Sequence, residues 1–163
     1  MLTKLKQNMK QLTKEKQKLN EIFKENQVVL AYLFGSAARG EIGPLSDIDI
    51  AILFSEKIKK EDYFEKELRL ATEIGKLFKI DRVDIINLET TRSPLLKQRA
   101  VLRGKPIFVV DEKKKIALER KILQEYEDTK YLRKVQGDIM KRQIKEGSFG
   151  VPVISIYSNN GNR

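Results

Sequence analysis

Apolar and polar positions follow two different periods along this chain. Four short segments are mostly apolar and have the length and composition typical of strands: residues 28–34, 47–53, 81–88 and 105–110. Residues 61–79 instead place apolar side chains three and four positions apart, which is the spacing of one helix face. The pattern predicts a core of strands and helices, residues 27–110, between two helical flanks.

The N-terminal flank, residues 1–26, is predicted to be one amphipathic helix. Its apolar residues recur at close to helical spacing, at Leu2, Leu5, Met9, Leu12, Leu19 and Phe23. A seam of this kind either packs across the core or pairs with a partner helix.

The C-terminal flank begins with residues 111–147, predicted to be one long charged helix that Asp111 caps and Gly147 ends, with Gly137 as a weak point inside it. Part of so long a helix is expected to project, either as a packing arm or as a partner-binding arm. Residues 148–163 are rich in Ser, Asn and Gly and are predicted to form a poorly ordered tail.

A shorter helix is predicted at residues 95–103. Ser93 is a good N-cap, Pro94 suits the first helical position, and Gly104 is a usual residue just after a helix end. Three basic residues near this helix are either surface charge or contacts to a phosphate or a partner: Arg99, Arg103 and Lys105.

The second predicted strand carries two carboxylates on one face. Side chains alternate along a strand, so Asp47 and Asp49 point together while Ile48 and Ile50 point to the other face. Such a pair is costly to bury unless a cation compensates it. Mg²⁺ is the economical choice, since one or two carboxylates commonly bind it together with substrate phosphates.

A glycine turn follows the first predicted strand directly. Gly35 lets the backbone approach a ligand closely, and Ser36 offers a hydroxyl and a backbone N–H at the mouth of a predicted helix. A phosphate cradle beside a carboxylate pair suits phosphoryl or nucleotidyl transfer, where positioning and charge neutralisation supply most of the catalysis.

Gly35-Ser36, ten residues, and then Asp47-Ile48-Asp49 resembles the G-S-x10-D-x-D signature of the DNA-polymerase-β-type nucleotidyltransferases. The surrounding Phe34 and Ala38-Arg39-Gly40 resemble the minimal nucleotidyltransferase (MNT) branch in particular. The resemblance covers about residues 28–110. It implies an α+β fold, a small mixed sheet with helices on one side.

The resemblance also implies roles for individual residues. Gly35 and Ser36 would hold the nucleotide triphosphate, and Asp47 and Asp49 would bind one or two Mg²⁺ ions. Arg39 is the best-placed cation to touch the phosphates, although it could equally pair with a neighbouring glutamate.

Asp84, in the third predicted strand, has two readings. From periodicity alone it is an exposed edge residue. The resemblance instead implies that Asp84 is the third carboxylate of the site. In that role it would be a further metal ligand and would accept the proton from the attacking hydroxyl. With no histidine in the chain, a carboxylate base is also chemically sensible.

Stand-alone MNT proteins commonly act as antitoxins of HEPN-domain ribonucleases. The resemblance therefore implies a Mg²⁺-dependent enzyme that transfers AMP from ATP to a tyrosine of a HEPN toxin. Two alternatives remain: an antitoxin that only masks its toxin, and an aminoglycoside-type enzyme that modifies a small molecule. The oligomeric state, homo-oligomer or hetero-complex, is left open.

The composition of the chain limits the kinds of site and the cellular location that are expected. The chain has no cysteine, which excludes disulfides and thiolate metal sites, and no apolar segment has the length of a signal-peptide core or a membrane span. The expected location is therefore the cytoplasm.

The net charge of +10 is concentrated in the flanks, at +4 for residues 1–25 and +4 for residues 111–163. A nucleic acid is not expected as the direct substrate.

Overall fold

The computed structural model describes residues 15–39 and 47–148. The described residues up to 125 form one compact unit, and those from 126 onward form a second. Predictions for residues 1–14, for the loop at 40–46 and for the tail at 149–163 lie outside the described residues. Within the described part of the chain, no helix is long and apolar enough to cross a membrane.

Four strands form one mixed sheet in the order β3-β2-β1-β4. Their bounds are β1 Val28–Phe34, β2 Ile48–Phe54, β3 Val83–Asn87 and β4 Lys105–Val109. β1 pairs antiparallel with both β2 and β4, whereas β2 and β3 are parallel. Parallel neighbours need a crossover connection, and here a short 3-10 turn, η1 (Lys60–Asp62), and helix α3 (Tyr63–Phe78) supply it.

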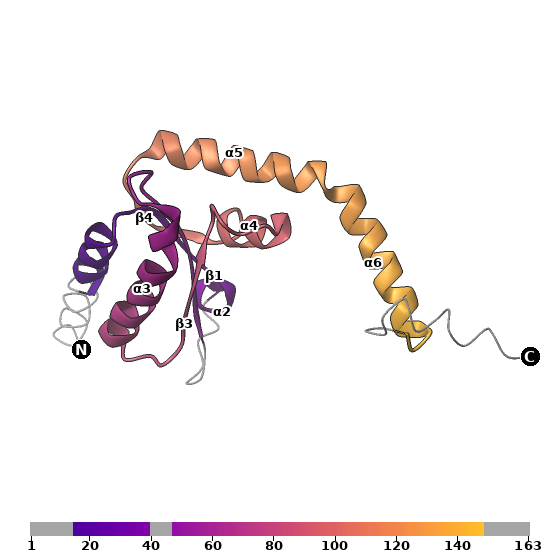
Figure 1. Cartoon of the computed structure of the whole chain (residues 1–163), viewed down its shortest axis with the longest axis horizontal. Helices are drawn as coiled ribbons and strands as arrows, with labels where there is room; N and C mark the ends of the chain where they lie inside the picture. Colours follow the sequence, from indigo (N-terminus) through magenta and orange to yellow (C-terminus); the bar gives the residue numbers. More distant parts are fainter. Residues whose placement is uncertain (1–14, 40–46, 149–163) are drawn as a thin grey trace, which may run out of the picture. The chain divides into compact units, whose positions relative to one another are not determined.

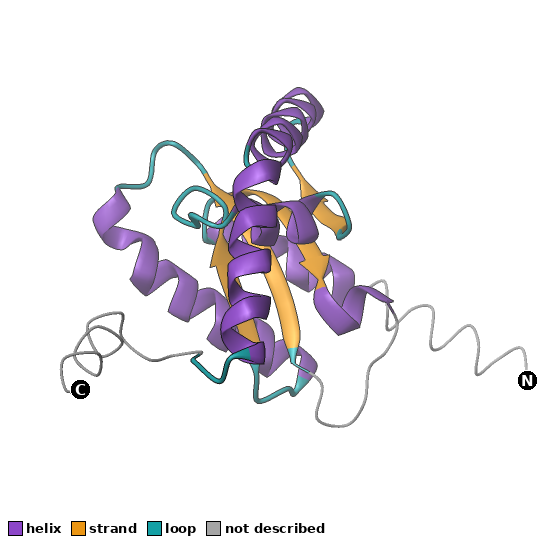
Figure 2. Cartoon of the chain, turned by 90° about the vertical axis from the view of Figure 1, so that its right-hand side faces the viewer, coloured by secondary structure: helices purple, strands orange, loops and turns teal. Residues whose placement is uncertain are grey.

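Helices cover both faces of this sheet, as Figure 1 and Figure 2 show. The N-terminal helix, described from residue 15 to 25, and α3 pack on one face, around Phe23, Ile52 and Ile74. Helices α4 (Pro94–Val101) and α5 (Glu112–Asp128) contribute Ala100, Val101 and Ile122 to a second cluster with Leu30, Tyr32 and Ala51.

The α+β class and the mixed sheet are therefore confirmed, but the expectation that the helices lie on one side of the sheet is wrong. The reason is visible in β1, where every residue is buried or half-buried. A strand that is apolar on both faces needs cover on both.

The predicted helix caps are confirmed. The Ser93 hydroxyl accepts a hydrogen bond from the Leu96 N–H at 3.2 Å, and Pro94 is the first residue of α4. Asp111 Oδ1 accepts from the N–H groups of Lys113 and Lys114, at 2.8 and 3.2 Å, at the start of α5. Each side chain satisfies backbone donors that the first helical turn leaves without partners.

The single helix expected over residues 111–147 is instead two helices. α5 ends at Asp128, and α6 (Lys130–Lys145) begins after Thr129. The Thr129 hydroxyl donates to the Tyr126 carbonyl at 3.3 Å, a local bond that competes with the helical ladder. Gly137, predicted as the weak point, lies inside α6 without interrupting it.

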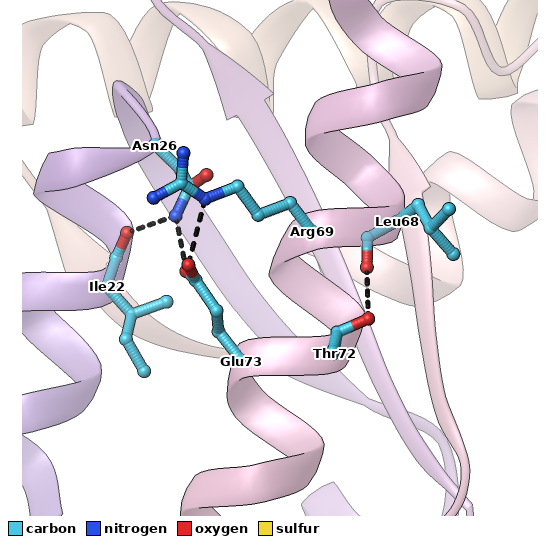
Figure 3. Close-up of polar contacts among 6 residues, drawn as sticks. All are labelled: Ile22, Asn26, Leu68, Arg69, Thr72 and Glu73. Atoms are coloured by element: carbon cyan, nitrogen blue, oxygen red, sulfur yellow. Dashed lines mark hydrogen bonds and ion pairs between the residues drawn. The ribbon is translucent and has the colours of Figure 1, made fainter.

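A polar cluster ties the end of the N-terminal helix to α3 (Figure 3). Asn26 is fully buried, and its Nδ2 donates to the Ile22 carbonyl at 2.9 Å and to Glu73 Oε2 at 2.8 Å. Arg69 Nε donates to Glu73 Oε1 at 2.8 Å. Burial raises the pKa of Glu73, but the hydrogen bonds from Arg69 and Asn26 outweigh it and hold that pKa below its ordinary value.

We expect Asn26→Ala to lower the free energy of unfolding by about 1–3 kcal/mol, because it removes two hydrogen bonds from a buried site. Thr72→Ala is the matched control: the Thr72 hydroxyl donates within α3 at an exposed position, and its loss should change stability by less than about 0.5 kcal/mol. Urea denaturation measures both. Equal effects would show that the buried cluster contributes nothing specific.

Candidate active site

The predicted site residues meet at one edge of the sheet, where β1 ends and β2 and β3 begin. Phe34, the last residue of β1, pairs with Asp49 of β2. Asp49 in turn pairs with Asp84 of the parallel strand β3. Paired residues on neighbouring strands point to the same face, so Asp49 and Asp84 lie side by side on the face that α4 and α5 cover. Asp47 immediately precedes β2.

Gly35 brings the backbone against this carboxylate pair. It starts the short helix α2 (Gly35–Arg39), with a φ of +70° that favours glycine. A Cβ at this position would lie 2.0 Å from Asp49 Oδ2. Glycine is therefore required here both for its backbone conformation and for the space that Asp49 occupies.

The three carboxylates influence one another electrostatically. Burial raises the pKa of Asp49, and the negative charges of Asp84 and then Asp47 raise it further. The negative charge of Asp47 is partly compensated by Arg82, whose Nη1 lies 4.0 Å from Asp47 Oδ2. The site thus holds negative charge that is costly without a cation.

The described residues contain no group of three or more carboxylate, histidine or cysteine side chains arranged to hold a metal ion by themselves. This does not exclude Asp47 and Asp49 as ligands. Mg²⁺ in nucleotide-dependent enzymes is usually bound by one or two carboxylates, with phosphate oxygens and waters completing its coordination. The two carboxylates and their unfavourable charge fit an ion that arrives with a nucleotide.

The basic residues that sequence analysis considered differ in their positions. Arg39 ends α2 and is exposed. Lys105 pairs with Leu33 across β1 and β4, which places it at the same sheet edge as Gly35. Arg99 lies on α4, which covers the sheet face.

Sequence analysis missed Arg82. Its backbone carbonyl accepts from the Ile48 N–H at 3.2 Å, which brings it beside Asp47. Only the register of β2 and β3 reveals this proximity, since the two residues are separated in the chain by the whole of α3.

A separate cavity of about 320 Å³ opens at the other end of β2. Its apolar lining comes from Leu53, Leu88, Leu118 and Ile122, and charged residues such as Lys97 and Glu125 surround it. Leu53 is four residues beyond Asp49, roughly 13 Å along the strand. The cavity is therefore distinct from the carboxylate site.

The model of a known family, described as polymerase beta, nucleotidyltransferase, matches residues 17–113. This span includes every strand of the sheet and all the carboxylates just described. The chain belongs to this nucleotidyltransferase family. No curated protein matches the sequence.

Several solved structures similar to this family member come from toxin–antitoxin complexes. A crystal structure of a toxin–antitoxin with AMP-PNP contains a chain of 25% identity and TM-score 0.64, with 77% of this chain and 98% of that chain covered. An MntA–HepT complex matches at 22% identity and TM-score 0.59, with 78% and 98% covered.

A third similar structure is a tri-AMPylated Shewanella oneidensis HEPN toxin in complex with MNT antitoxin, at 23% identity and TM-score 0.59, again with 78% and 98% covered. At these identities the last two matches show the fold alone. All three share the fold of this nucleotidyltransferase.

We expect Gly35→Ala to destabilise the protein by about 1–3 kcal/mol, because alanine must adopt a left-handed conformation and displace Asp49. Gly137→Ala is the control: no atom lies within 4 Å of its added Cβ, and in a helix the change should be neutral or stabilising by up to about 1 kcal/mol. Chemical denaturation of both variants tests this. A Gly35→Ala protein as stable as wild type would contradict the geometry.

Asp84→Asn is expected to lower the pKa of Asp49 and to raise stability at pH 7. A carboxyl group with a higher pKa in the folded state than in the unfolded state lowers the free energy of unfolding as the pH rises through these two pKa values. Removing the Asp84 charge brings the folded pKa of Asp49 closer to its unfolded value, so part of this loss of stability is recovered. NMR titration of Asp49 and melting temperatures at pH 4 and pH 7 provide the measurement. Asp81→Asn is the control: Asp81 is not among the charges that raise the pKa of Asp49, so this variant should change neither that pKa nor the melting temperature. If Asp84→Asn left the pKa of Asp49 unchanged, the coupling between the two carboxylates would be refuted.

Proposed function

We propose that this chain is a Mg²⁺-dependent nucleotidyltransferase that transfers AMP from ATP to a tyrosine hydroxyl of a HEPN-domain toxin, and so acts as its antitoxin. The observation that carries the proposal is the convergence of the Gly35 turn on Asp49, which lies in register with Asp84. Nucleotidyl transfer needs a backbone that can approach the phosphates closely and several carboxylates beside it, and both lie at this edge of the sheet.

Each site residue has a proposed role. Gly35 and Ser36 bind the triphosphate through the backbone that the glycine turn exposes, and Arg39 binds its phosphate oxygens. Asp47 and Asp49 hold Mg²⁺, with Asp84 as a further ligand at the same edge. When bound, the metal ion neutralises the phosphates and stabilises the charge that develops on them.

The proposed reaction is an in-line substitution at the α-phosphorus of ATP. The acceptor hydroxyl oxygen forms the new P–O bond while the bond to the β-phosphate oxygen breaks, and pyrophosphate leaves. Asp84, exposed at the start of β3, accepts the proton of the attacking hydroxyl. A carboxylate is the available base, because the chain has no histidine.

The donor and the acceptor are proposed by likeness to the neighbours. The complex with AMP-PNP, at 25% identity, supports an adenine nucleotide as the donor. The complex that contains a tri-AMPylated HEPN toxin motivates a toxin hydroxyl as the acceptor. The match covers nearly the whole of each neighbouring chain, so the proposal requires no part that this chain lacks.

Intact-mass spectrometry tests the reaction. The product of the adjacent gene, as the proposed acceptor, is incubated with the full-length protein, ATP and Mg²⁺, and should gain one or more adenylyl groups. Asp47→Ala/Asp49→Ala and chelation with EDTA should each reduce the rate by at least about 100-fold, as expected when charge stabilisation in the transition state is removed.

Asp81→Asn is the control for a general change of charge near the site and should retain full transfer. A stable complex with no mass gain would favour an antitoxin that only masks the toxin. Mass gain on aminoglycosides but not on the protein would favour the small-molecule enzyme.

A further inference from the structure

Helix α6 exposes an apolar stripe. Tyr131, Leu132, Val135 and Ile139 fall within about 100° of the helix circumference at 3.6 residues per turn. Their exposed fractions are 74%, 60%, 37% and 48%. Leu132, Val135 and Ile139 alternate at spacings of three and four, as do the residues with which one helix packs against another. α6 contributes no buried residue of its own, so this face is not used for packing within the described part of the chain.

The same helix is strongly basic. From Lys130 to Lys145 it contains six Lys and Arg residues and one acidic residue, Asp138, a net charge of +5. Four lysines form a second stripe, within about 60° of the circumference: Lys130, Lys134, Lys141 and Lys145. Among the described residues, only Lys130 of this stripe has an ion pair, with Glu127 at 3.6 Å. An apolar face bordered by uncompensated positive charge is complementary to an apolar face bordered by acids.

We propose that α6 is the docking helix for the acceptor protein, which contacts it through an amphipathic helix whose apolar face is flanked by Asp and Glu. The inference rests on the proposed function for the identity of the acceptor, the HEPN-domain toxin. It adds the surface that selects this partner. A helix laid against a helix buries the apolar stripe, and the acidic flanks pair with the lysines.

Two other occupants fit the observations less well. A second copy of the chain would bring two helices of charge +5 together, and this repulsion opposes association. An RNA strand would satisfy the lysines but leave the aliphatic side chains Leu132, Val135 and Ile139 exposed, because single-stranded RNA is bound by aromatic stacking and cations.

The position of α6 in the sequence agrees with a role in selecting a partner. The family match ends at residue 113, before α6 begins. α6 therefore lies outside the segment that defines the family.

The test compares three variants of the full-length protein. Leu132→Ala/Ile139→Ala removes the centre of the apolar stripe while keeping strong helix formers. Met140→Ala/Ile144→Ala makes the same kind of change on the same helix, away from the stripe. Lys134→Gln/Lys141→Gln removes two charges of the lysine stripe. Circular dichroism confirms that each variant keeps its helices.

Binding of the proposed acceptor, the product of the adjacent gene, is measured by calorimetry. The stripe variant should bind at least about tenfold more weakly, since a few buried apolar anchors dominate such interfaces. The lysine variant should bind more weakly and lose most of its salt dependence, and the Met140/Ile144 variant should bind as wild type does. The affinity for AMP-PNP should be unchanged in all three, because none of them alters the carboxylate site.

Wild-type affinity in the stripe variant, or an equal loss in the Met140/Ile144 variant, would overturn the inference. So would a dimer in sedimentation that the stripe variant dissociates, or tighter binding of a labelled single-stranded RNA than of the acceptor protein. A failure of the proposed function alone gives a different result, because the acceptor protein would still bind through α6 but would gain no adenylyl group.

Discussion

The contact between the Gly35 backbone and the Asp49 carboxylate is the constraint on which the rest of the site depends. With a Cβ position only 2.0 Å from Asp49 Oδ2, no side chain fits between the turn and the strand. The antiparallel pairing of β1 with β2 fixes that distance, and the parallel pairing of β2 with β3 adds Asp84 to the same edge. The carboxylates therefore meet because three strands keep one register, and a shift of one residue would turn Asp49 to the opposite face.

This arrangement is electrostatically unfavourable by itself. The pKa of Asp49 is raised by its partial burial and by the neighbouring charges of Asp84 and Asp47. Within the described chain, the ion pair at these residues joins Asp47 to Arg82 over 4.0 Å. Functional sites commonly store such unfavourable charge, because the ligand that relieves it then binds with added free energy. The apolar clusters on the two sheet faces supply the stability that lets the fold tolerate this cost.

The buried core and the exposed apolar helix belong to different parts of the chain. The unit of residues 1–125 contains the sheet, both apolar clusters and the carboxylates. α6, in the second unit, buries none of its residues and carries its apolar side chains exposed. A helix with this combination of exposed aliphatic groups and net positive charge is poorly explained by packing alone, which is why a protein partner is the economical explanation.

The sequence by itself determined the local features of this protein. The order of strands and helices in the core, the Ser93 and Asp111 caps, and the position of Asp47 and Asp49 at the start of β2 all follow from short-range rules of spacing and backbone chemistry. The Gly-Ser and Asp-Ile-Asp pattern also indicated the family, which the match over residues 17–113 bears out. These features depend on residues close together in the chain, so periodicity and motif spacing suffice to find them.

Only the tertiary structure decided what distant residues do together. Asp84 lies beside Asp49, and Arg82 beside Asp47, through strand register across the whole of α3, which periodicity cannot supply. The cover of both sheet faces depends on the burial of β1, whose residues are all buried or half-buried. The reason is the same in each case: long-range pairing and burial select among alternatives that local sequence leaves nearly equal in free energy.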